Sequence, residues 1–133
     1  MDLASKLQFI DDILKKGEFP NQDDLRQAIE EYIKQMPNWI YSLPNDDIQR
    51  VAIAGLILNE ESFYGQAVQY YYNIEYNAYQ EQKRGGVSSW DLGHGPQIEI
   101  AQRNLKIRIK MYLEDMDFPE KITDFIKERL DKI

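Results

Sequence analysis

The sequence predicts an all-α fold, in which residues 1–133 form a single compact domain of about six helical segments. Two observations favour this fold. Apolar residues recur at spacings of three and four through most of the chain, as in Leu3, Leu7, Ile10 and Leu14. The chain has 133 residues, 43% of them apolar, which suits one hydrophobic core and is short for two.

The first two helices are expected at residues 3–16 and from Pro20 onward. Gly17 allows the chain to leave the first helix in a left-handed conformation. Asn21 is the expected cap of the second helix, and Pro37 ends that helix because its ring clashes with a preceding helical turn. The apolar connection that follows Pro37 is expected to fold over the core; the alternative is an exposed binding patch.

A helix near residues 46–58 is expected to be the central and most buried one, because its second half is apolar on nearly every side. Gly55 lies inside this helix. Glycine makes a helix less stable than alanine does by about 1 kcal/mol, so its presence here indicates that a neighbouring backbone comes too close for a side chain. A single helix from residue 46 to residue 84 would be about 58 Å long, which is too long for a compact domain of this size. We therefore expect a break near residues 60–62, with Ser62 capping the next segment.

That next segment, residues 63–82, contains six of the nine tyrosines. Its residues divide into two apolar stripes and a polar face. The first stripe is Phe63, Ala67, Tyr71, Ile74 and Ala78, and the second is Tyr64, Val68, Tyr72, Tyr76 and Tyr79. The polar face is expected to hold Gln66, Gln69, Tyr70, Asn73, Asn77 and Gln80.

A glycine-rich flexible loop is expected at residues 84–96, and it carries Trp90, Asp91 and His94. His94 is the only histidine of the chain. Oriented by Asp91, it would be a candidate general base. The alternative, a histidine that faces solvent from a loop, is favoured because no nucleophile motif accompanies it.

Residues 97–113 fit two periodicities. Alternating apolar and basic residues suggest a strand, but no turn residues bound one and no partner strand is evident, so a helix is favoured. As a helix, the segment places Arg103, Lys106 and Lys110 in a basic stripe, which we expect to pair with Glu99 and Glu114. The last helix is expected to start with a capping box from residue 117 to residue 120.

Several function classes find no support in the sequence. The chain has no cysteine, so disulfides and thiolate chemistry are excluded, and it has no glycine motif for nucleotide phosphates. Glu60 and Glu61 point about 100° apart on a helix, so they cannot act as a pair on one substrate. We therefore expect a protein that is not an enzyme and that uses no metal or cofactor.

The location expected for the protein is cytoplasmic. Its longest strongly apolar run has eight residues, whereas a membrane span needs about 20. The first residues carry an acid before any base and lack the apolar core of a secretory signal. No contact with a membrane is expected.

The charge of the chain is unevenly distributed. The net charge is −7, and residues 59–82 contain four glutamates and no base. Such a segment repels phosphate backbones, so we expect no direct binding of nucleic acid, and it attracts a basic protein surface. The alternative is that the charge serves solubility alone.

The acidic, tyrosine-rich helix is the best candidate for partner binding, because tyrosine is enriched at protein interfaces. The alternative is that these tyrosines form the rim of the core. The candidate binding residues are Glu60, Glu61, Tyr64, Tyr72, Glu75, Tyr76 and Tyr79.

In size, acidity and lack of catalytic motifs, the chain is similar in kind to small bacterial protein inhibitors, such as immunity proteins, antitoxins and phage-encoded anti-defence proteins. This resemblance of bulk properties implies a stoichiometric inhibitor of a basic protein that acts on nucleic acid. The alternative is a structural or accessory subunit that forms a homodimer through the tyrosine-rich helix. A third hypothesis is an enzyme that uses His94 and Asp91.

Overall fold

The computed structural model describes residues 3–36, 46–84 and 97–133, and every regular element in these ranges is a helix. The predicted all-α fold is therefore confirmed. The helices are α1 (Leu3–Lys15), α2 (Gln22–Gln35), α3 (Asp47–Leu58), α4 (Glu61–Arg84), α5 (Ile98–Met116) and α6 (Glu120–Asp131).

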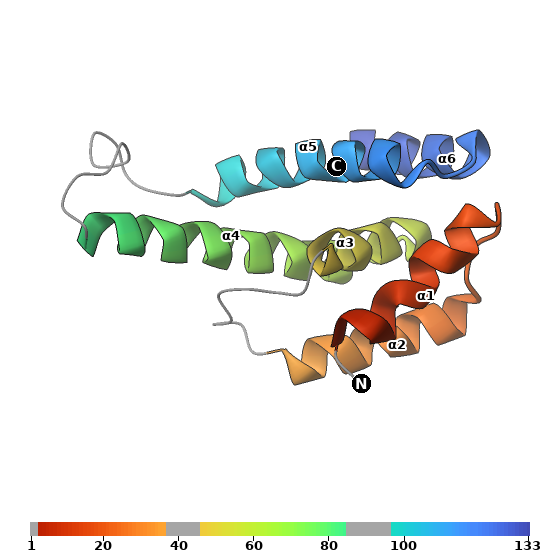
Figure 1. Cartoon of the computed structure of the whole chain (residues 1–133), viewed down its shortest axis with the longest axis horizontal. Helices are drawn as coiled ribbons and strands as arrows, with labels where there is room; N and C mark the ends of the chain where they lie inside the picture. The colour runs from red at the N-terminus through yellow and green to blue at the C-terminus, as the bar shows by residue number, and fades with distance from the viewer. Residues whose placement is uncertain (1–2, 37–45, 85–96) are drawn as a thin grey trace.

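The helices stack in layers, with α5 and α6 on one side of α3 and α4 and with α1 and α2 on the other (Figure 1). Helix α3 contacts all five other helices, and its residues from Asp47 to Ile57 are all buried. The predicted central helix is thus confirmed. Helices α4 and α5 lie side by side and extend together beyond the ends of the other helices (Figure 1). In these ranges, no helix is long and apolar enough to cross a membrane.

The chain breaks between α3 and α4, as predicted. Asn59 adopts a left-handed conformation (φ 55°), and the amide of Glu60 donates to the carbonyl of Gly55 at 2.8 Å, which closes the end of α3. The prediction that Ser62 caps α4 is wrong. Ser62 lies inside α4, and its hydroxyl donates to the carboxylate of Glu60 at 3.0 Å.

At two of the other helix ends the predicted capping residue is found, and at a third it is not. The side chain of Asn21 accepts the amide of Asp24 at 3.1 Å, so it caps α2 as expected, and Gly17 is left-handed (φ 79°). The predicted capping box at the start of α6 is wrong, because Asp117 takes the left-handed conformation that ends α5 (φ 54°). Helix α6 follows Pro119 with no side-chain cap.

The segment with two periodicities is helical, within α5. Two bases of its basic stripe, Lys106 and Lys110, contact the last residues of the chain and not the acids of α5. Lys110 pairs with Asp131 at 3.3 Å, and Lys106 donates to the backbone carbonyl of Ile133 at 2.5 Å. The expected pairing with Glu99 and Glu114 within the helix is not the arrangement found, because α6 packs beside this face of α5.

The close approach predicted at Gly55 is confirmed. A Cβ atom there would lie 2.8 Å from the amide nitrogen of Tyr64 and 3.1 Å from the carbonyl oxygen of Glu60. Both atoms belong to backbone, which cannot move aside as a flexible side chain can. Helix α4 therefore crosses α3 at a distance that only glycine permits.

We predict opposite effects of one substitution at two glycines. Gly55→Ala should destabilise the protein by about 1–3 kcal/mol, because the new methyl group overpacks the α3–α4 crossing. Gly65→Ala should stabilise it by about 0.5–1 kcal/mol, because Gly65 is an exposed position within α4 with no atom within 4 Å of an added Cβ. Urea unfolding followed by circular dichroism measures both. Equal effects at the two sites would contradict the close crossing.

Candidate functional site

A buried ionic cluster joins four helices. It consists of Asp11 from α1, Tyr32 from α2, Asp47 and Arg50 from α3, and Tyr112 from α5. The guanidinium of Arg50 contacts Asp11 and Asp47, each at 2.9 Å. The hydroxyl of Tyr32 donates to Asp47 at 2.9 Å, and that of Tyr112 donates to Asp11 at 2.5 Å. Both aspartates are fully buried and Arg50 is 6% exposed.

The cluster holds two acids and one base in a place that excludes water. Burial raises the pKa of Asp47, although its bonds to Tyr32 and Arg50 act in the opposite direction. Burial also raises the pKa values of Tyr32 and Tyr112, so both stay neutral and donate hydrogen bonds. Burial disfavours the charge of Arg50, but the interactions with Asp11, Tyr112 and Asp47 together outweigh it, so the pKa of Arg50 is raised. The cluster joins α1, α2, α3 and α5 through buried charges, which suits a structural role.

This cluster was not predicted from the sequence, although the sequence contains a sign of it. Asp11 lies four residues after Leu7 and three before Leu14, so it interrupts the apolar stripe of α1. A charged residue at a core position of an amphipathic helix indicates a buried partner.

The tyrosines of α4 divide into buried and uncovered ones. Tyr70 is fully buried and Tyr64 is 6% exposed. The expected place of Tyr70 on the polar face is therefore wrong, and Tyr64 does not lie on an open surface. Tyr71 is half-buried beneath Arg108, whose guanidinium carbon lies 5.6 Å from the centre of the ring.

The remaining rings form the tyrosine ridge, which we define as Tyr72, Tyr76 and Tyr79. Ring centroids are 6.1 Å apart between the first two and 6.3 Å apart between the last two. Tyr76 is 45% exposed, and the other two are half-buried. The ridge runs along the second half of α4, in the part of the helix that extends beyond the core (Figure 1).

The carboxylates expected to accompany these rings are partly engaged by the protein itself. Glu60 pairs with Arg26 of α2 at 2.5 Å, and this hydrogen bond lowers the pKa of Glu60. Glu75 accepts a hydrogen bond from Asn104 of α5 at 3.3 Å. Glu61 is exposed and has no hydrogen bond or ion pair within the described ranges.

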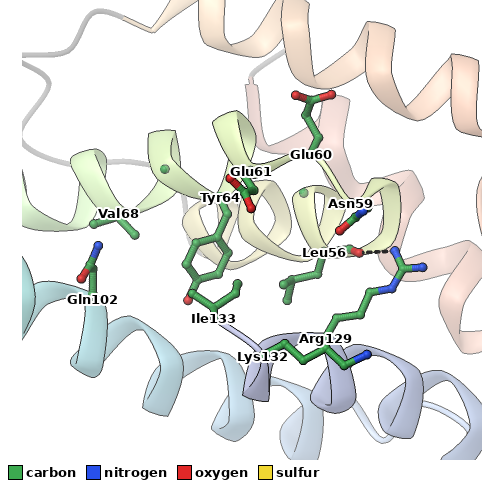
Figure 2. A pocket seen from close by; sticks show the side chains of 12 residues that line it. Leu56, Asn59, Glu60, Glu61, Tyr64, Val68, Gln102, Arg129, Lys132 and Ile133 are labelled. Atoms are coloured by element: carbon green, nitrogen blue, oxygen red, sulfur yellow. Dashed lines mark hydrogen bonds between the residues drawn. The ribbon is translucent and has the colours of Figure 1, made fainter.

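A pocket of about 580 Å³ lies beside the start of α4, and we call it the α4–α6 pocket. Its lining comes from the end of α3, the first turns of α4, α5 and the last residues of the chain (Figure 2). The lining includes Leu56, Asn59, Glu61, Tyr64, Val68, Gln102, Arg129, Lys132 and Ile133. This volume lies in the range of small-ligand sites, about 300–1,000 Å³.

Tyr64 contributes both an apolar wall and an unpaired polar atom to the pocket. Its ring extends from α4 toward Ile133 (Figure 2). Burial raises the pKa of Tyr64 to about 12, so the hydroxyl keeps its proton. That hydroxyl is buried and has no hydrogen-bond partner among the residues the structure describes. An unpaired buried hydroxyl is unfavourable by about 1–3 kcal/mol.

Other predicted site residues are not tested. Trp90, Asp91 and His94 lie outside the described residues, as does the apolar connection at 38–44, so a site built on His94 stays a prediction. In the part of the chain that is described, no group of three acidic, histidine or cysteine side chains could hold a metal ion.

Comparison with known proteins gives no family for this chain. A scan of family models, a search of curated proteins and a search of solved structures found no match.

We predict that the ionic cluster dominates stability. Arg50→Met should destabilise the protein by about 3–5 kcal/mol, because two buried aspartates lose their counterion. Tyr112→Phe should have a smaller effect, about 1–3 kcal/mol, because Asp11 loses one hydrogen bond and its other oxygen already has no partner.

Tyr76→Phe is the matched control for Tyr112→Phe, since it removes an exposed hydroxyl and should leave stability unchanged. Urea unfolding measured for all three variants tests the ranking. If Arg50→Met were as stable as the native protein, the ion pairs could not hold the helices together.

Proposed function

We propose that this protein is a binding module that covers a basic surface of another protein through the tyrosine ridge. The ridge carries this proposal, because three neighbouring aromatic rings, one exposed and two half-buried, follow one another along the second half of α4. Tyrosine offers a large, rigid apolar surface with a polar tip, which is why it is frequent among the residues that dominate binding energy.

An arginine-bearing partner fits the ridge. Within the protein, the guanidinium of Arg108 already lies over the ring of Tyr71, one residue before the ridge. The same cation–π interaction is open to arginines of a partner at Tyr76, whose ring is exposed. The absence of any base from residues 59–82 favours the approach of a cationic surface.

Covering a basic surface would inhibit a partner that uses this surface to bind nucleic acid. A protein that acts on nucleic acid presents arginines and lysines to phosphates. A module that binds this surface with one-to-one stoichiometry would exclude the nucleic acid. Such a module would be an inhibitor of the same general kind as immunity proteins, antitoxins and anti-defence proteins. We place this interaction in the cytoplasm, where a neutraliser of such a partner would act.

A second candidate function uses the same residues. The exposed rings of the ridge could pack on a second copy of the chain and form a homodimer. Such a dimer would make the protein a structural or accessory subunit. The exposure of Tyr76 supports this candidate as well as the first.

One set of variants separates the two candidates. In Tyr72→Ala/Tyr76→Ala/Tyr79→Ala, the loss of contact area should abolish capture of a basic protein from the source lysate, with the melting temperature kept within a few degrees. Ile107→Ala/Met111→Ala is the control, because it removes exposed apolar side chains from α5. Binding of the captured protein should weaken as salt rises from about 0.1 M to about 0.5 M.

The purified partner should lose its action on nucleic acid at one equivalent of the native protein and keep it in the presence of the ridge variant. Unchanged capture by that variant would overturn the proposal. Sedimentation measures the oligomeric state and tests the second candidate function. A dimer that the ridge substitutions convert to a monomer would support the homodimer instead.

A further inference from the structure

The negative charge in the α4–α6 pocket belongs to Glu61. Two glutamates line this pocket, but they point in different directions (Figure 2). Glu60 turns away toward α2, where it is paired with Arg26, and it also accepts from Ser62. Glu61 lies on the pocket side of α4 and has no ion pair within the described ranges. The pocket therefore contains one carboxylate that the protein itself does not neutralise.

The two bases at the pocket are already engaged. The guanidinium of Arg129 donates to the carbonyls of Leu56 and Ile57 at 2.7 and 2.8 Å, so its charge is offset by the negative end of the α3 dipole. Its guanidinium also lies over the ring of Phe125, 4.3 Å from the centroid. These contacts hold Arg129 at the wall of the pocket.

Lys132, the other base, lies 3.7 Å from Glu128, an acid of α6. Its side chain is 73% exposed, so water screens its charge. Neither base therefore cancels the charge of Glu61 across the pocket.

The rest of the lining suits a long side chain with a polar end. Leu56, Val68 and the ring of Tyr64 supply apolar surface, and the amides of Asn59 and Gln102 supply acceptors. The hydroxyl of Tyr64 is buried and lacks a partner within the described ranges, so the residue adds an unused polar atom behind its ring at the wall.

We propose that the α4–α6 pocket binds an arginine side chain of the basic partner, an inference that rests on the proposed function. The methylene stem of the arginine packs against Leu56 and Val68, and its guanidinium pairs with Glu61. Arginine fits better than lysine, because its planar group presents five donors to several acceptors, while an ammonium is more strongly hydrated.

The position of the pocket connects it to the ridge. Tyr64 and Val68 of the pocket belong to the same stripe of α4 as Tyr72, Tyr76 and Tyr79. A partner that lies along this stripe brings one side chain over the pocket while its surface covers the rings. The pocket then fixes where along α4 the partner binds.

The experiment uses a single arginine blocked at both ends as the probe, followed by NMR shifts of the full chain. Its control is the same compound made with citrulline, which has the shape of arginine without the charge. The arginine probe should shift the amides of Leu56, Gly65 and Val68, and the citrulline probe should bind about two- to fivefold more weakly.

Protein variants test the residues. Glu61→Gln should weaken the arginine probe by about two- to fivefold, and Tyr64→Phe by about twofold. Glu114→Gln removes an exposed glutamate from α5 that does not line the pocket, and it should leave the affinity unchanged. Equal binding of citrulline, or an unaltered affinity in Glu61→Gln, would overturn the assignment of the pocket.

An arginine-rich peptide of about a dozen residues distinguishes a protein partner from a free small molecule. It should bind more tightly than the single arginine, and both Glu61→Gln and the triple ridge variant should weaken it. A peptide that binds no better than the single arginine would overturn the assignment to a protein partner. If only the ridge substitutions weaken the peptide, the pocket proposal fails and the proposed function stands. If only Glu61→Gln weakens it, the pocket binds arginine, but the ridge is not the surface that a basic partner covers and the proposed function fails.

Discussion

The contact between Arg50 and its two buried aspartates restricts how α1, α2 and α5 can be placed around α3. Apolar side chains tolerate small shifts of one helix along another, because any apolar neighbour can replace the one lost. A buried carboxylate has no such freedom, since losing its counterion leaves a charge without water or partner. Asp11 therefore fixes α1, and through Tyr32 and Tyr112 the same cluster fixes α2 and α5. One guanidinium sets the register of four helices.

Helix α4 is the one large element near the centre that contributes nothing to this cluster. It is held against α3 by the close crossing at Gly55 and against α5 along its length. Its second half therefore does not have to be buried for the core to be complete. This separation explains how three tyrosines can stay exposed or half-buried on a helix whose first half, with Phe63 and Tyr64, is well packed.

The helices and the break after α3 could be predicted because apolar spacing, prolines and caps act locally. The predictions were wrong at positions whose conformation or burial depends on an element that is distant in the sequence. Tyr70 looked polar beside glutamines, yet it follows Phe63 by seven residues and so shares the face that packs on α3. The capping box failed because the chain turns sharply between α5 and α6, and Asp117 is needed to end α5. The α4–α6 pocket joins residues from four parts of the chain, so no local pattern could reveal it.

The charges of α4 and α5 also explain where a cationic partner would be attracted. Residues 59–82 contain no base, and residues 100–113 of the adjacent helix contain four bases and no acid. The two helices thus complement one another, and Arg108 and Asn104 of α5 already contact α4. Glu75, in the middle of α4, accepts a hydrogen bond from the neutral side chain of Asn104. Glu61, the first residue of α4, has no ion pair within the described ranges, so a cationic partner would meet a free carboxylate beside the pocket, while the ridge offers contact area.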